Sequence, residues 1–139
     1  MKILFYNHTG QVSGAERVLL LILANLNRTR FEPVLLSPKG ELRNNATAAG
    51  VRCENVSQLQ ARFTWRPQLL LQYLASFIFV IREVRARVRA CGPELIHANS
   101  IRAGLVVSVA TVGLRVPGLP AIILKPAGNA RSGASVLRR

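Results

Sequence analysis

Short runs of β-forming apolar residues alternate with longer segments of helical periodicity, and this order constrains the fold more than any other feature of the chain. The expected strands cover residues 2–7, 31–37, 51–56, 94–98 and 121–124. The expected helices lie between them, over residues 13–27, 41–49, 67–90 and 101–114. Strands that alternate with helices form a parallel sheet with helices on both faces. The sequence therefore predicts an α/β domain.

The length of the chain limits the number of domains, and its charge indicates the class of partner. Its 139 residues suffice for about one domain, and half of them are hydrophobic. The formal net charge is +13, from 19 Lys and Arg residues against six acidic residues, all of which are Glu. This excess favours an anionic partner such as nucleic acid, acidic lipid or a phosphorylated sugar. Arginines scattered over an ordinary solvated surface are the alternative interpretation.

The sequence lacks the residues that several kinds of catalytic and binding site require. There is no Asp for a Ser-His-Asp triad, and no phosphate loop of the G-x-x-x-x-G-K-[ST] type. Cys53 and Cys91 are far apart, and His8 and His97 are the only histidines, so we expect neither a metal site nor a cofactor. The apolar run at the start is too short for a signal peptide, which predicts a cytoplasmic protein.

The loop after the first strand is the leading candidate for a ligand site. The expected site residues in it are Gly10, Gln11, Ser13, Gly14 and Glu16. Ser13 and Glu16 have capping-box spacing, which marks the start of a helix whose free N–H groups suit phosphate. Ligands of parallel α/β sheets bind outside the carboxyl ends of the strands. The alternative is an ordinary turn whose glycines only satisfy backbone geometry.

The end of the 94–98 strand carries a second candidate. His97 is the expected catalytic residue, as a general base or as a hydrogen-bond partner of a sugar or phosphate. Asn99 and Ser100 suit recognition of hydroxyl groups, and Ser100 can cap the next helix. Alternatively, His97 packs inward while Asn99 and Ser100 only form the cap.

The long helix over residues 67–90 invites a membrane interpretation. One apolar stripe is expected to face the sheet: Leu70, Leu74, Phe77, Ile81, Val84 and Val88. The polar residues expected opposite are Gln68, Gln72, Ser76, Glu83 and Arg87. The end of the helix carries a cluster of arginines at 82, 85, 87 and 89, and Phe63 and Trp65 precede the helix. These residues suit peripheral contact with the anionic inner face of the membrane. Alternatively, the helix only covers the sheet, and its arginines are favourably placed near its C-terminus.

Together these segments resemble the N-terminal domain of family 4 glycosyltransferases. The resemblance rests on residues 1–10, 13–19, 31–34, 49–51 and 94–100 and covers roughly residues 1–125. It implies the N-terminal half of a GT-B fold, in which two Rossmann-like domains face each other. It also implies transfer of a sugar from a nucleotide-sugar donor to a glycan or lipid acceptor, without a metal. Gly10, Gly14, His97 and Asn99 would then border the interdomain cleft.

Two departures from the pattern of that family affect the activity that we expect of this chain. Many relatives have His-x-His where this chain has His97 and Asn99, and we expect this chain to lack their donor-binding C-terminal domain. We expect an acceptor-side domain over residues 1–125 and a disordered or aberrant tail over residues 126–139. A truncated chain would be inactive alone. The alternatives are a basic, non-catalytic module for anionic membrane or nucleic acid, and a subunit of a split transferase that pairs with a separate C-terminal domain.

Overall fold

The computed structural model describes residues 1–59 and 67–114, and for residues 67–70 it describes the backbone alone. The expected strand at 121–124, the tail at 126–139 and the aromatic residues Phe63 and Trp65 lie outside these ranges. The proposed boundary at residue 125 therefore stays a prediction.

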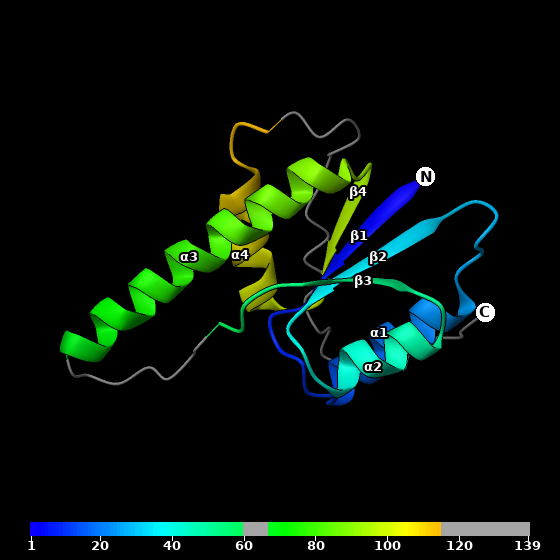
Figure 1. The fold of residues 1–139 in the computed structure, drawn as a ribbon, viewed down its shortest axis with the longest axis horizontal. Coiled ribbons are helices and arrows are strands. Elements are labelled where there is room, and N and C mark those ends of the chain that lie inside the picture. Colours follow the sequence, from blue (N-terminus) through cyan, green and yellow to red (C-terminus); the bar gives the residue numbers. More distant parts are fainter. Residues whose placement is uncertain (60–66, 115–139) are drawn as a thin grey trace, which may run out of the picture.

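Four parallel strands form the centre of the molecule (Figure 1). They are β1 (Lys2–Tyr6), β2 (Glu32–Ser37), β3 (Arg52–Asn55) and β4 (Leu95–Ala98), in the spatial order β3-β2-β1-β4. Leu4 of β1 pairs with Val34 on one side and Ile96 on the other. Pro33 lies early in β2, and pairing with β3 begins at Val34, so no bond to β3 is lost at the proline.

Two helices cover each face of the sheet (Figure 1). The helices α1 (Gly14–Asn25) and α2 (Glu41–Ala48) lie on one face, and α3 (Pro67–Cys91) and α4 (Ile101–Thr111) lie on the other. Alternate residues of a strand point to opposite faces, so Ile3 and Phe5 pack against α1 and α2 while Leu4 and Tyr6 pack against α3 and α4. The prediction of a Rossmann-like α/β domain is confirmed.

Local chemistry explains where the helices begin and end. Ser13 and Glu16 form the predicted capping box at the start of α1. Gly50 follows α2 with a φ of 73°, and Gly92 follows α3 with a φ of 54°. Both angles lie in the left-handed region that glycine adopts without strain, which ends each helix.

The apolar stripes differ in part from the expected ones. In α3 the buried residues are Val80, Val84 and Val88, whereas Leu74 is exposed. Glu83 was expected on the solvent side, but it is half-buried and its Oε2 accepts a hydrogen bond of 2.8 Å from the Ser57 N–H. The amino-terminal turns of α3 extend beyond the sheet, so residues on its stripe there have less to pack against (Figure 1).

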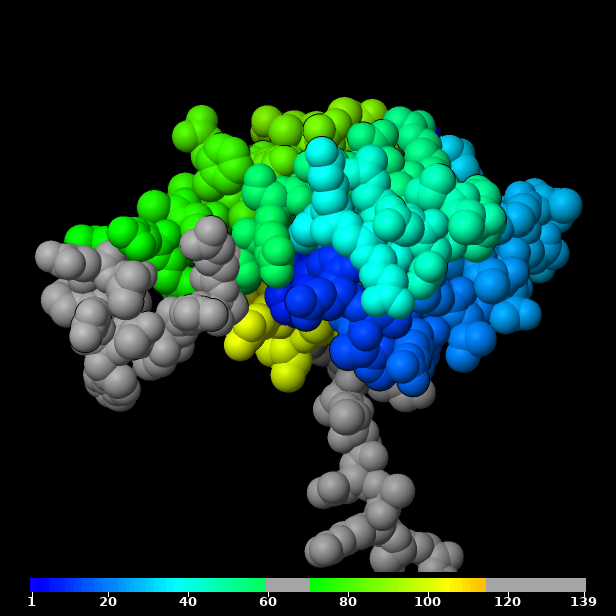
Figure 2. Space-filling model, turned by 60° about the horizontal axis from the view of Figure 1, so that its bottom comes forward, coloured from blue at the N-terminus to red at the C-terminus, as the bar shows by residue number. Residues whose placement is uncertain are grey.

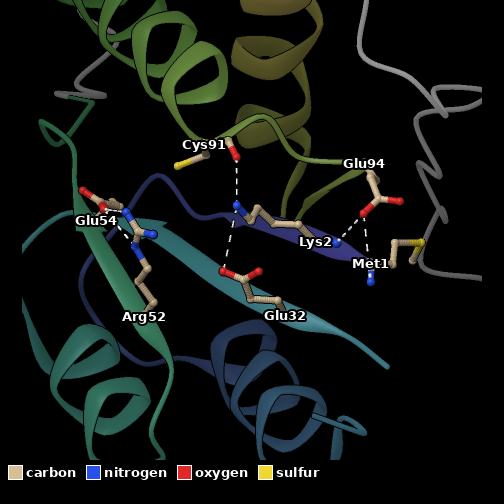
Figure 3. A network of polar contacts seen from close by, with 7 residues as sticks. All are labelled: Met1, Lys2, Glu32, Arg52, Glu54, Cys91 and Glu94. Atoms are coloured by element: carbon tan, nitrogen blue, oxygen red, sulfur yellow. Dashed lines mark hydrogen bonds and ion pairs between the residues drawn. The ribbon is translucent and has the colours of Figure 1, made fainter. Parts of the chain in front are cut away.

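The amino edge of the sheet is held by a polar network (Figure 3). The Lys2 Nζ donates to the Cys91 carbonyl at 3.2 Å and lies 3.9 Å from the Glu32 carboxylate. The Lys2 N–H donates to Glu94 Oε1 at 3.0 Å, and the Met1 amino group lies 4.0 Å from the same oxygen. These exposed ion pairs each contribute at most about 1 kcal/mol. Glu32 and Glu94 thus form ion pairs at the amino edge, which is opposite the candidate ligand site at the carboxyl edge.

Across the described part of the chain, no helix has both the length and the apolar character that crossing a bilayer requires.

Candidate ligand site at the carboxyl edge of the sheet

The loops after β1 and β4 meet at the carboxyl edge of the sheet, because the two strands are adjacent and parallel. The Asn99 N–H extends the pairing by donating to the Tyr6 carbonyl at 3.1 Å. Beyond it, Asn99 Nδ2 donates to Asn7 Oδ1 at 3.2 Å, and Ser100 Oγ lies 3.0 Å from His8 Nδ1. Figure 2 shows the β1–α1 segment (blue) between α4 (yellow) and the start of α2 (cyan). The two loops are thus joined through Asn7 and His8, whereas Gly10 contacts the β2–α2 loop.

A buried carboxylate organises the first loop. Glu16 is 3% exposed, and its carboxylate accepts hydrogen bonds from the Ser13 N–H at 3.1 Å, from the Ser13 hydroxyl, and from Asn7 Nδ2 at 3.2 Å. Burial opposes the charged form, but the hydrogen bonds from Ser13 and Asn7 outweigh it and hold the pKa of Glu16 below its usual value. Glu16 is therefore an anion that only accepts hydrogen bonds at neutral pH.

Gly10 is needed for the contact between two loops. A Cβ on Gly10 would overlap the Lys39 carbonyl oxygen and lie 2.9 Å from its carbon. The Gly10 carbonyl accepts a hydrogen bond of 3.0 Å from the Leu42 N–H near the start of α2. At Gly14, by contrast, a Cβ would meet no atom within 4 Å among the described residues. Close packing therefore requires glycine at position 10 but not at position 14.

The other predicted residues of the first loop are accessible. Gln11 and Ser13 are exposed, and the Gln11 N–H donates to Thr9 Oγ1 at 3.2 Å. They lie immediately before α1, whose first N–H groups carry the partial positive charge of a helix N-terminus. Whether they contact a ligand stays a prediction.

His97 and Ser100 both have structural partners. The His97 ring packs against Phe5 with centroids 5.4 Å apart, and burial lowers the pKa of His97. Ser100 caps α4 by accepting a hydrogen bond of 3.1 Å from the Ala103 N–H. A catalytic role for His97 stays a prediction.

Asn7 and His8 are the site residues that sequence reasoning missed. Asn7 is fully buried and bonds to both Glu16 and Asn99. Burial lowers the pKa of His8, and the nearby Arg102 lowers it further, so its imidazole is neutral at pH 7. Their position directly after the first strand was the available signal, because such residues always lie at the carboxyl edge.

The parallel sheet with helices on both faces defines a Rossmann-like α/β domain. The sequence also matches a family model, described as "Glycosyl transferase 4-like domain", over residues 13–135. The chain belongs to this glycosyltransferase family, as its resemblance to family 4 glycosyltransferases predicted. No curated protein matches it.

Two solved structures share the fold. The crystal structure of HepE from Anabaena in complex with UDP-glucose has a TM-score of 0.56 and 21% sequence identity, over 81% of this chain and 26% of that one. The HepE structure with UDP and glucose has a TM-score of 0.51 and 22% identity, over 81% of this chain and 27% of that one. This chain thus matches about a quarter of the length of these relatives.

Proposed function

We propose that the chain is the acceptor-side domain of a glycosyltransferase that uses a nucleotide-sugar donor. Its family supports the reaction class, and the UDP-glucose bound in the HepE structure supports the class of donor. The observation that carries the proposal is the contact of the 7–16 loop with residues 97–100 at the carboxyl edge. In an α/β sheet this is the edge at which ligands bind.

The chemistry of this edge fits the acceptor side of a transfer reaction. Apart from the ionised Glu16 and the nearby Arg102, the polar side chains described there are neutral: two histidines whose pKa values are lowered, asparagines and hydroxyl groups. Such groups hydrogen-bond sugar hydroxyls. The N–H groups at the start of α1 suit one phosphate, but a leaving diphosphate needs further cations or N–H groups around it. We therefore propose that transfer requires a donor-binding domain, supplied by another segment or by a separate chain.

A titration of the 15N-labelled chain with glucose, as a probe for the hydroxyl groups of a sugar acceptor, tests this proposal. We expect the changes in amide chemical shift to concentrate in residues 7–16 and 97–102. Asn99→Ala should weaken the response, while Arg52→Ala, at the amino edge of β3, serves as the matched control and should leave it unchanged. Shifts confined to other parts of the sheet would contradict the location of the site. Rapid sugar transfer by the chain alone would contradict the need for a second domain.

The net charge favours a second candidate, a basic module that binds anionic membrane or nucleic acid. Arg82 and Arg89 are exposed on α3 and suit such a contact. This function predicts binding to anionic vesicles or to an oligonucleotide that falls steeply with salt, is weakened in an Arg82→Gln/Arg89→Gln variant, and is indifferent to UDP-glucose.

A further inference from the structure

Three side chains at the carboxyl edge form a directional chain of hydrogen bonds that begins at Glu16. The ionised Glu16 carboxylate has no proton to donate, so every partner must donate to it. Its Oε2 is occupied by Ser13 and its Oε1 by Asn7 Nδ2, at 3.2 Å. The carboxylate therefore dictates which end of the Asn7 amide points towards it.

A second acceptor fixes the Asn7 amide in the same sense. Asn7 Nδ2 also donates to the Thr9 carbonyl at 2.8 Å. Reversing the amide would turn its oxygen towards both a carbonyl and a carboxylate, losing two hydrogen bonds in a site where Asn7 is fully buried. Asn7 Oδ1 is consequently the atom left to face Asn99.

The same reasoning orients Asn99. Because Asn7 Oδ1 only accepts, Asn99 must turn its Nδ2 inwards, and the two atoms lie 3.2 Å apart. The Asn99 backbone is held by its N–H bond to the Tyr6 carbonyl at 3.1 Å. Asn99 itself is only half-buried, and its Oδ1 has no hydrogen-bond partner within residues 1–59 and 67–114.

We propose that Asn99 Oδ1 is a fixed hydrogen-bond acceptor that selects a hydroxyl donor of the sugar or acceptor and disfavours a phosphate group, with Glu16 and Asn7 as positioning residues. A hydroxyl can donate to this oxygen, whereas a phosphate group without a P–OH, as in a nucleotide-sugar diphosphate, could only face it as a second acceptor. Phosphate groups are then left to the N–H groups at the start of α1. The location of the ligand rests on the proposed function, but the orientation of the amide does not.

The orientation is tested first, without any ligand, by Asn99→Asp. The new carboxyl is isosteric, but it can bond to Asn7 Oδ1 only in its protonated form. Its pKa, followed by carbon-13 NMR, should therefore be at least about one pH unit higher than that of Asn44→Asp, a control on the exposed face of α2. Equal pKa values for the two variants would overturn the proposal.

Ligand selection is tested on the wild-type chain, so it does not depend on whether the variant folds. Glucose should shift the side-chain amide signals of Asn99, and dimethyl phosphate, an anion with no P–OH donor, should leave them unchanged. A shift of these signals by dimethyl phosphate, with competition between dimethyl phosphate and glucose, would overturn the proposal. A raised pKa in Asn99→Asp together with no response anywhere to glucose would support the fixed orientation and count against the proposed function.

Discussion

Replacing Gly10 by alanine tests whether glycine is required at position 10 by the packing of the β1–α1 loop against the β2–α2 loop. The new Cβ would overlap the Lys39 carbonyl oxygen and lie 2.9 Å from the Lys39 carbonyl carbon and 3.2 Å from the Gly40 Cα. All three are backbone atoms, which cannot move aside by a rotamer change. The β1–α1 and β2–α2 loops must therefore separate to admit the methyl group.

The size of the effect follows from two contributions. Overpacking in a tight contact costs about 1–3 kcal/mol. Separating the loops also weakens the 3.0 Å hydrogen bond from the Leu42 N–H to the Gly10 carbonyl, worth about 1 kcal/mol. We expect Gly10→Ala to lower the free energy of unfolding by about 2–4 kcal/mol, measured by urea denaturation with circular dichroism.

Gly14→Ala is the matched control for that substitution. Its Cβ would meet nothing within 4 Å among the described residues, and Gly14 does not have a positive φ. Alanine at the start of α1 should therefore be neutral or stabilise the chain by up to about 1 kcal/mol. Equal stabilities of the two variants, or a loss below about 0.5 kcal/mol for Gly10→Ala, would refute the packing argument.

Three further substitutions probe other parts of the fold. Because burial lowers the pKa of His97 below its unfolded value, the unfolded chain binds the proton more readily, so the melting temperature should fall as the pH drops below about 6.5. His97→Phe should reduce this pH dependence while keeping the ring contact with Phe5; an unchanged pH profile would contradict it. Val84→Ala should cost about 2 kcal/mol in denaturant unfolding, because Val84 of α3 is fully buried in the core between α3 and the sheet. Ser100→Ala should cost about 1 kcal/mol by removing the cap of α4, and a melting temperature equal to that of the wild type would exclude this role.

Local signals in the sequence were sufficient to predict the elements and their order. Each of the four described strands starts and ends within about one residue of its expected bounds. The Ser13 and Glu16 capping box and the terminating glycine at position 50 also occur as predicted. These features depend on neighbours in the sequence, so a single chain reveals them.

The buried face of each helix was harder to predict. In α1, Val18 and Ile22 belong to the apolar pattern but are exposed, while Leu19 and Leu23 are buried. A helix with apolar residues on a wide arc does not itself define which part of that arc meets the sheet. In α3, Val80 was not among the expected stripe residues, yet it is fully buried.

The polar partners in the site could not be predicted from the sequence. The contacts of Asn7 with Asn99 and of His8 with Ser100 join residues that are 92 positions apart. The shared strand edge was predictable from the parallel topology, but the side-chain pairing also depends on the register between β1 and β4. The sequence suggested a ligand role for Gly10. The structure shows instead that glycine is required at position 10 because the backbone of the β2–α2 loop leaves no room for a Cβ, and this contact between distant segments is not visible in the sequence.

The central position of β1 has a kinetic consequence. Leu4 pairs with Val34, 30 positions along the chain, and with Ile96, 92 positions along it. Closing the longer loop costs about 1 kcal/mol more in chain entropy, so we expect β1 to join β2 before it joins β4 during folding. Asn7 and Asn99 come together only in that later step, so we expect the contacts at the carboxyl edge to form after β1 has joined β2.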